Sequence, residues 1–258
     1  STHPVFPEIV RATIQCLDAD LPPAGIKIGM LANADNIHVI SDYLEKLHLH
    51  YLYSASPAAS VGQGASPPRR PPIPVVLDPI LRSSSGRELI DSAAFIALRE
   101  RLLPLVDWVT PNLSEIAALT GIPIVSRDDL PRASRALQAQ VSQWHAGHPI
   151  GIFATGGHLE PPDDFLLTPD GEETWLPGER VLTRATHGTG CALSSSFLSR
   201  LVLGDAPIEA AHIAKQYVSG ALRNATPRGT GNSSMNHLWN IYQPEIPEFQ
   251  SKLLIPNE

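Results

Sequence analysis

Cysteine is scarce in this chain of 258 residues, and its two cysteines, Cys16 and Cys191, lie far apart. Two distant cysteines do not make a disulfide framework, so we expect free thiols and a cytoplasmic location. No apolar run approaches the roughly 20 residues that span a bilayer, and no secretory signal is visible, so no membrane partner is expected. Positive charge is also sparse. The 19 Lys and Arg against 26 Asp and Glu give a net charge of −7, which argues against nucleic acid as a partner.

The composition that remains is typical of a globular protein. Hydrophobic residues make up 43% of the chain and charged residues 17%, enough for the core of one large domain over residues 1–258. Residues 54–72 differ, because they consist of Ser, Ala, Gly and Pro with two arginines and few large apolar side chains. We interpret this stretch as a flexible insertion on the surface.

Short apolar runs alternate with amphipathic stretches along most of the chain. Strands are expected at 24–28, 73–77, 108–110 and 150–154, and a hairpin pairs 165–168 with 173–176 across a Pro-Asp-Gly turn. Helices are expected at 9–17, 35–47, 87–103, 114–119, 128–145, 190–203 and 207–225. The tail from Thr226 has weak periodicity. The alternation predicts an α/β fold with a mostly parallel central sheet flanked by helices on both faces.

The strongest local motif is Thr-His-Gly-Thr-Gly-Cys-Ala-Leu at 186–193, which opens a predicted helix. Small residues before a helix let several backbone N–H groups converge, and the helix dipole adds partial positive charge there. Such a site suits a phosphoryl group in transfer. Cys191 falls in the first turn, where the pKa of a thiol tends to fall, so its thiolate could act as a base. A glycine-rich turn with a buried small cysteine explains the same residues.

Three other motifs place polar groups after predicted strands. Asp78 follows a buried strand, where open α/β sheets bind ligands, although a turn cap is also possible. Asn112 and Glu115 lie three residues apart and could face one ligand, but they also fit a helix capping box. Thr155, Gly156 and Gly157 form a turn that a nucleotide could approach, and a simple tight turn needs the same residues. No Walker A loop, Gly-x-Ser-x-Gly elbow or His-Glu-x-x-His motif occurs.

Taken in order, these motifs resemble those of the hydroxymethylpyrimidine and phosphomethylpyrimidine kinases of thiamine biosynthesis, a family of the ribokinase-like superfamily. The resemblance runs from about Pro4 to Trp239. It is carried by Lys27 to Leu31, Val75 to Pro79, Ser84 to Gly86, Thr110 to Glu115, Leu119 to Gly121, Thr155 to His158, His187 to Cys191, and Ala214 to Val218. It implies that ATP is the phosphoryl donor, with Mg²⁺ as cofactor, and that a hydroxymethylpyrimidine or its monophosphate is the acceptor. It also implies a possible homodimer.

The resemblance also implies roles for single residues. Cys191 would take the proton of the substrate hydroxymethyl group, and the backbone N–H groups of Gly188, Thr189, Gly190 and Cys191 would hold the transferring phosphoryl. Met30 and Ile80 would line the pyrimidine pocket. Asp78 and Glu115 would hold Mg²⁺, partly through water. Asn112, Thr155 and Gly157 would lie near the ATP phosphates.

Departures from the family pattern leave other readings open. Thr155 stands where many members carry a lysine that reaches the ATP phosphates, so Arg82 or another cation would have to substitute. The 54–72 stretch is longer than the pattern requires, and the strands with which members begin have no match here, so we expect the chain to be N-terminally incomplete. Pyridoxal or pyridoxine kinase activity is one alternative, because its acceptor is also a hydroxymethyl heteroaromatic. A non-catalytic pyrimidine-binding homologue is the other.

Overall fold

The computed structural model describes residues 3–55, 73–82, 86–144, 149–227 and 229–241. Its sheet has six strands in sequential order, β1 (Ile26–Ile28), β2 (Val75–Leu77), β3 (Trp108–Val109), β4 (Gly151–Ala154), β5 (Asp164–Leu167) and β6 (Glu173–Leu176). Strands β1 to β4 pair in parallel, and β5 and β6 add antiparallel pairs. The mostly parallel sheet and the hairpin predicted from the sequence are confirmed. Among the described residues β1 pairs only with β2.

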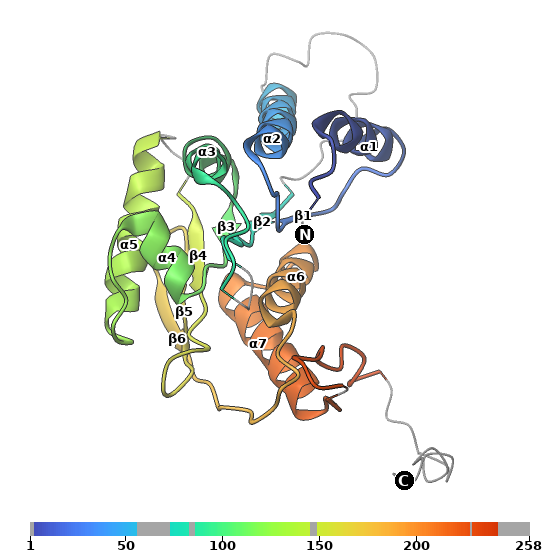
Figure 1. The fold of residues 1–258 in the computed structure, drawn as a ribbon. Helices are drawn as coiled ribbons and strands as arrows, with labels where there is room; N and C mark the ends of the chain where they lie inside the picture. The colour runs from blue at the N-terminus through green and yellow to red at the C-terminus, as the bar shows by residue number, and fades with distance from the viewer. Residues whose placement is uncertain (1–2, 56–72, 83–85, 145–148, 228, 242–258) are drawn as a thin grey trace, which may run out of the picture.

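The helices form two layers with the sheet between them (Figure 1). One layer holds α1 (Pro7–Asp20), α2 (Ala34–Ala55), α3 (Ser92–Ala97), α4 (Leu113–Thr120) and α5 (Asp129–Trp144). The other holds α6 (Thr189–Val202) and α7 (Pro207–Arg223). The helix α3 continues into a π-helix, Leu98–Leu102, and a 3-10 turn, Leu103–Leu105. None of the described helices is long and apolar enough to cross a membrane.

Successive side chains of a strand point to opposite faces of the sheet, and this divides the core into two parts. Val75 and Leu77 of β2 pack against the layer with α2 to α5, whereas Val76 packs on α6 and α7. All three are essentially inaccessible to solvent. Trp108 and Phe153 point to the second layer too, where each meets the ring of Phe197 edge-on. The sheet therefore buries both faces, as a parallel sheet requires.

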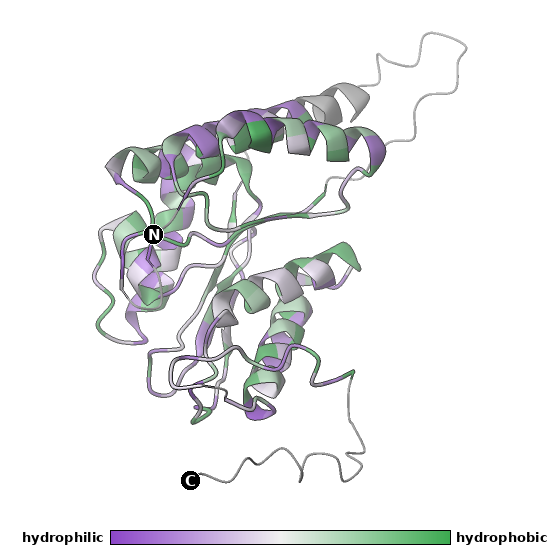
Figure 2. Ribbon diagram, turned by 45° about the vertical axis from the view of Figure 1, so that its right-hand side comes forward, coloured by the Kyte–Doolittle hydropathy of each residue, from purple (hydrophilic) through white to green (hydrophobic). Residues whose placement is uncertain are grey.

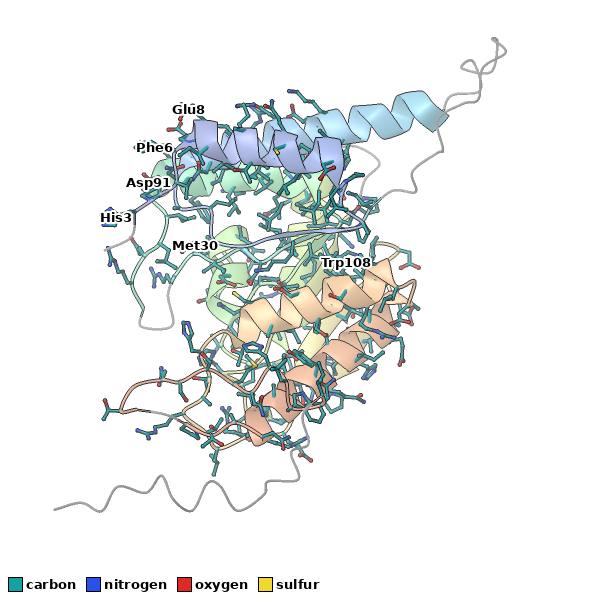
Figure 3. All side chains as sticks on the ribbon, turned by 90° about the vertical axis from the view of Figure 1, so that its right-hand side faces the viewer. His3, Phe6, Glu8, Met30, Asp91 and Trp108 are labelled. Carbon is teal, nitrogen blue, oxygen red and sulfur yellow. The ribbon has the colours of Figure 1, made fainter. Side chains whose placement is uncertain are left out.

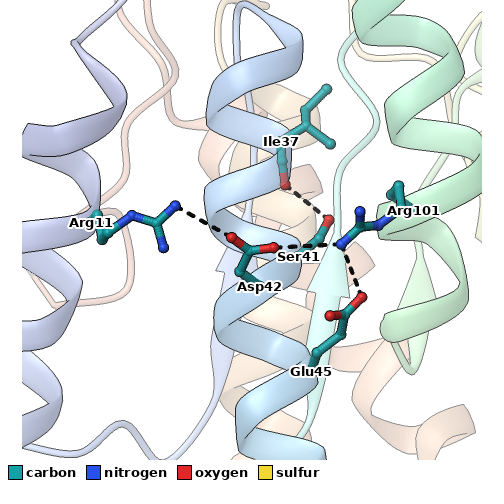
Figure 4. A network of polar contacts seen from close by, with 6 residues as sticks. All are labelled: Arg11, Ile37, Ser41, Asp42, Glu45 and Arg101. Carbon is teal, nitrogen blue, oxygen red and sulfur yellow. Dashed lines mark hydrogen bonds and ion pairs between the residues drawn. The ribbon is translucent and has the colours of Figure 1, made fainter.

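Helix α1 lies against α2 near the surface of the molecule. It begins with a proline, a favourable first residue of a helix, and none of its residues is buried. Figure 2 shows hydrophobic and hydrophilic residues alternating along α1 and α2. Figure 4 shows one of the polar contacts between them: Asp42 of α2 pairs with Arg11 of α1 at 3.3 Å and with Arg101 of the π-helix at 3.5 Å.

Most predicted elements are confirmed, with shifted ends. The helix predicted at 87–103 begins five residues late, because the side chain of Asp91 caps it by accepting the N–H of Ala94. The helix predicted at 35–47 continues to Ala55, so it includes the first two residues of the predicted insertion. The remainder of that insertion, 56–72, lies outside the described residues.

Candidate functional site

The residues that follow the parallel strands meet at one edge of the sheet. Strand pairing continues past the strands themselves, because the N–H of Asp78 donates to Ile28 O at 2.8 Å and that of Thr155 to Pro111 O at 2.9 Å. Asn112 and Thr155 form an isolated parallel bridge. Residues that are 43 positions apart in the printed sequence, Asn112 and Thr155, thus become neighbours at the carboxyl edge, the usual ligand site of an open α/β sheet.

The amino end of α6 has the backbone of an anion site. Gly188 precedes the helix with φ 84° and ψ 10°, the left-handed region that glycine tolerates, and no side chain caps the helix. The first intrahelical bond comes from the N–H of Ala192 to Gly188 O, so helix geometry leaves the N–H groups of Thr189, Gly190 and Cys191 available. A Cβ at Gly188 or Gly190 would meet no atom within 4 Å, which leaves room for a ligand above the helix end.

Asp78 links this helix to the strands. Asp78 is buried, with 7% of its side chain exposed, and its Oδ2 accepts a hydrogen bond from the Ser194 hydroxyl of α6 at 3.3 Å. The same oxygen pairs with Nζ of Lys27 at 3.3 Å. Lys27 and Ser194 were not assigned roles from the sequence. A charged residue in the middle of a three-residue apolar strand was the available signal for Lys27, whereas nothing in the sequence marks Ser194.

Glu115 is the second buried carboxyl group at this edge, 5% exposed. The capping-box alternative is confirmed: the Glu115 carboxylate accepts the N–H of Asn112 at 2.8 Å, and Asn112 Oδ1 accepts the N–H of Glu115 at 3.0 Å. Burial raises the pKa of Glu115 to about 7, and the charge of Asp78 adds to the rise. Asn112 Oδ1 also accepts from Ser114, so only the amide NH₂ of Asn112 is left for phosphate.

The two carboxyl groups have suitable donor atoms for Mg²⁺, which prefers oxygen ligands. The two buried carboxylates repel each other, and a cation bound between them would relieve this repulsion. Across the described ranges no cluster of three or more potential metal-binding side chains occurs. Asp78 and Glu115 would be the side chains that hold Mg²⁺ here, and Mg²⁺ commonly completes its shell with waters and substrate phosphates.

The thiol pKa of Cys191 is shifted in the direction opposite to the prediction. The residue is exposed in the first turn of α6, as predicted, but its thiol pKa is raised, not lowered. Partial burial is the largest cause, and the carboxylate of Asp78 is the next, while the ammonium of Lys27 acts in the opposite direction. The expectation of a lowered thiol pKa, based on the helix end alone, was wrong because it included neither the partial burial nor the neighbouring carboxylate. Without bound ligands the thiol is protonated at neutral pH.

The glycine turn after β4 has one structural and one open position. The N–H of Gly156 donates to Asp164 Oδ1 at 2.8 Å, and a Cβ there would lie 1.8 Å from the carbonyl oxygen of Asp163. Gly157 has open space within 4 Å of its Cβ position. Lys215 of α7 holds the same turn through Asp164 Oδ2 at 2.7 Å. Close approach of a ligand is thus possible at Gly157 but not at Gly156.

Apolar and basic groups border the same edge. Met30 is 47% exposed just beyond β1, and Figure 3 shows it at the opposite end of the strands from Trp108. A Cβ on Gly29 would lie 3.9 Å from Cδ1 of Ile80, so Ile80 is close to the end of β1. Arg82, the cation named as a substitute, instead pairs with Glu88 on the surface. A separate open groove lies between the segment before α6 and the end of α7, and it is lined by Val181, Leu182, Thr183, Arg184, Leu222, Arg223, Ala225 and Pro227.

Comparisons with known proteins agree with this arrangement. The model of the phosphomethylpyrimidine kinase family matches residues 59–236. A hydroxymethylpyrimidine/phosphomethylpyrimidine kinase of Streptomyces coelicolor is 34% identical over 232 residues, which cover 90% of this chain and 75% of that protein. The crystal structure of a phosphomethylpyrimidine kinase from Clostridium difficile 630 superposes with a TM-score of 0.62 at 27% identity, covering 84% of this chain and 77% of that one. An ADP complex of Bacillus subtilis pyridoxal kinase superposes at 0.72 with 24% identity, covering 92% and 78%.

Proposed function

From the premise that the chain belongs to the phosphomethylpyrimidine kinase family and is a kinase, we propose that it transfers the γ-phosphoryl group of ATP to a hydroxymethylpyrimidine or its monophosphate. The observation that supports this most is the uncapped amino end of α6 next to two buried carboxyl groups from β2 and α4. Phosphoryl transfer depends mostly on positioning and charge neutralisation, and these groups supply both.

The backbone at 188–191 receives the transferring phosphoryl group. Its N–H groups point where negative charge gathers in the transition state, and they need no rearrangement to do so. The substrate hydroxymethyl oxygen forms the new bond to the γ-phosphorus while the bond from that phosphorus to the β-phosphate oxygen breaks, which releases ADP. Mg²⁺ held by Asp78 and Glu115 would supply neutralising charge to the phosphates.

Cys191 accepts the proton of the substrate hydroxyl group in this proposal. A thiol with a raised pKa is a stronger base once it is ionised, but a smaller fraction is ionised at neutral pH. Lys27 opposes the effect of Asp78 on the thiol. Partial burial first, and then the charges of Asp78 and Lys27, therefore set how readily Cys191 can serve.

The acceptor pocket lies beyond β1, where Met30 is exposed and Ile80 lies near Gly29. The phosphates of ATP would extend toward Gly157 and Asn112. Pyridoxal kinase activity is less favoured. The similarity to the pyridoxal kinase structure, at 24% identity, supports the fold only, whereas the relative at 34% identity is named for pyrimidine substrates. A cytoplasmic location and a homodimer remain predictions within this proposal.

ATP turnover coupled to ADP detection tests the proposal with three acceptors: hydroxymethylpyrimidine, its monophosphate and pyridoxal. We expect turnover with a pyrimidine, and a Cys191→Ala variant that loses at least about a hundred-fold in kcat, the range of general-base catalysis, while still binding ATP. Cys16→Ala is the matched control, since Cys16 is the other free cysteine and lies on α1. Faster turnover of pyridoxal would replace the substrate assignment, and unchanged turnover in Cys191→Ala would remove Cys191 from the mechanism.

A further inference from the structure

Lys27 occupies a position that an apolar side chain would normally fill. Its neighbours Ile26 and Ile28 pack on the layer with α2, so Lys27 faces α6. Gly25, two residues earlier on that face, lies so close to α6 that a Cβ would be 2.5 Å from Val202. In the sheet register Lys27 pairs with Val76, which is fully buried. The side chain of Lys27 is itself only 21% exposed.

Among the residues that the structure describes, the ammonium group of Lys27 has one charged partner. Asp78 lies two residues beyond Val76, on the same face of the sheet, and its Oδ2 is 3.3 Å from Lys27 Nζ. The Ser194 hydroxyl donates to that same oxygen at 3.3 Å, so β1, β2 and α6 meet there. Gly29 makes this reach possible, since a Cβ on it would be 2.8 Å from Nζ. In the part of the chain described, Lys27 is the only cation within salt-bridge distance of Asp78.

A divalent cation at Asp78 and Glu115 therefore competes with an ammonium group that is already there. Two cations beside one carboxylate repel each other strongly in a partly buried place. The repulsion falls when an anion of high charge enters, because phosphate oxygens can accept from the ammonium and bind the metal together. Metal and nucleotide should consequently favour each other's binding.

We propose that Lys27 is a positioning residue that occupies Asp78 until the phosphates of the nucleotide arrive, so that the divalent metal binds with the nucleotide and not ahead of it. The inference rests on the proposed function, because Asp78 is taken as a metal ligand. It assigns to Lys27 an order of binding that depends on its charge and on its reach past Gly29.

The affinity of the protein for a divalent metal, measured in the absence of catalysis, tests this order of binding. Mn²⁺ serves as the probe, its free concentration followed by electron paramagnetic resonance, with and without AMP-PCP. The unmodified protein should bind Mn²⁺ weakly alone and more tightly with AMP-PCP. Lys27→Met should bind Mn²⁺ alone on the order of ten-fold more tightly, because one nearby positive charge is gone. Lys27→Arg should resemble the unmodified protein, and Lys46→Met, which removes an exposed lysine on α2, is the matched control.

Two outcomes would overturn the proposal: no gain in nucleotide-free Mn²⁺ affinity in Lys27→Met, or a Lys27→Arg variant that behaves like Lys27→Met. If Lys27→Met does not fold, Gly29→Ala decides, because the new methyl displaces the ammonium without changing charge. It too should raise nucleotide-free Mn²⁺ affinity, and an unchanged affinity would refute the role. Turnover of the unmodified protein with a pyrimidine and ATP is scored separately, so failure of the kinase assignment and failure of the Lys27 role give different results.

Discussion

Substituting Glu115 by Gln should change how the stability of the protein depends on pH. The Glu115 carboxyl group has a pKa of about 7 in the folded protein, compared with 4.5 when it is unperturbed. Between these values the unfolded chain has lost the proton while the folded chain keeps it. Unfolding then releases a proton, so the free energy of unfolding decreases as pH rises through this window and levels off above pH 7. Below pH 4.5 both states hold the proton and the penalty is absent.

The size of the effect follows from the shift. Each pKa unit corresponds to about 1.4 kcal/mol, so the ionised Glu115 costs the folded protein about 3 kcal/mol above pH 7. This is a large share of the stability of an ordinary domain. Gln keeps the side-chain oxygen that accepts the N–H of Asn112, so the capping contact can persist without the charge. Glu115→Gln should therefore gain stability over the unmodified protein as pH rises from 4.5 to 7.

Urea unfolding of both proteins at half-unit steps between pH 4 and pH 8 measures this difference. Taking the difference between the two curves removes the titrations that they share, such as those of Asp129 and Asp170, whose pKa values backbone and hydroxyl hydrogen bonds lower. Parallel curves would refute the account of Glu115 as a carboxyl group strained by burial. Adding Mg²⁺ together with AMP-PCP at pH 8 should stabilise the unmodified protein more than Glu115→Gln, since the cation favours the ionised form.

Two further predictions concern packing and surface charge. Gly156→Ala should lower the free energy of unfolding by about 2–3 kcal/mol, because its Cβ would overlap the Asp163 carbonyl. Gly157→Ala is the control, since a Cβ there would have open space around it. Equal thermal midpoints for the two variants would contradict the placement of this turn. Asp42→Asn removes the ion pairs with Arg11 and Arg101 shown in Figure 4, yet these side chains are 38–44% exposed, so denaturation should show a loss below about 1 kcal/mol that shrinks in high salt. A larger, salt-insensitive loss would mean that α1 depends on Asp42 for packing.

The secondary structure was predictable where periodicity and local signals agree. The helix at 114–119 and its end at Gly121 follow from the capping box and from the glycine, which has φ 72°. The segment after Thr226 had weak periodicity, yet Trp239 packs on Gly220 of α7, and Met235 is buried beside it. Contacts made by single side chains across a large sequence distance leave no periodic signal, so this segment could not be placed from the sequence.

The sequence predicts which residues meet at the edge of the sheet, but not how their charges interact. Position after a strand was enough to select Asp78, and small residues before a helix were enough to select the backbone of α6. The pKa of Cys191 and the pairing of Lys27 depend on distances between β1, β2 and α6, which the sequence does not contain. A motif can thus place a thiol correctly in the first turn of a helix while giving the wrong direction for the shift of its pKa.

The cations that could replace the lysine of the family pattern illustrate the same distinction. Thr155 carries no charge, and Arg82 pairs with Glu88 at the surface. Two arginines line the open groove: Arg184, which donates to the Thr230 carbonyl at 3.4 Å, and Arg223, which pairs with the exposed Glu179 at 3.0 Å. An exposed ion pair is worth little, so the pairs of Arg82 and Arg223 would cost little to break. Which of these cations lie near one another follows from the fold, because the sequence alone does not bring the segment before α6 to the end of α7.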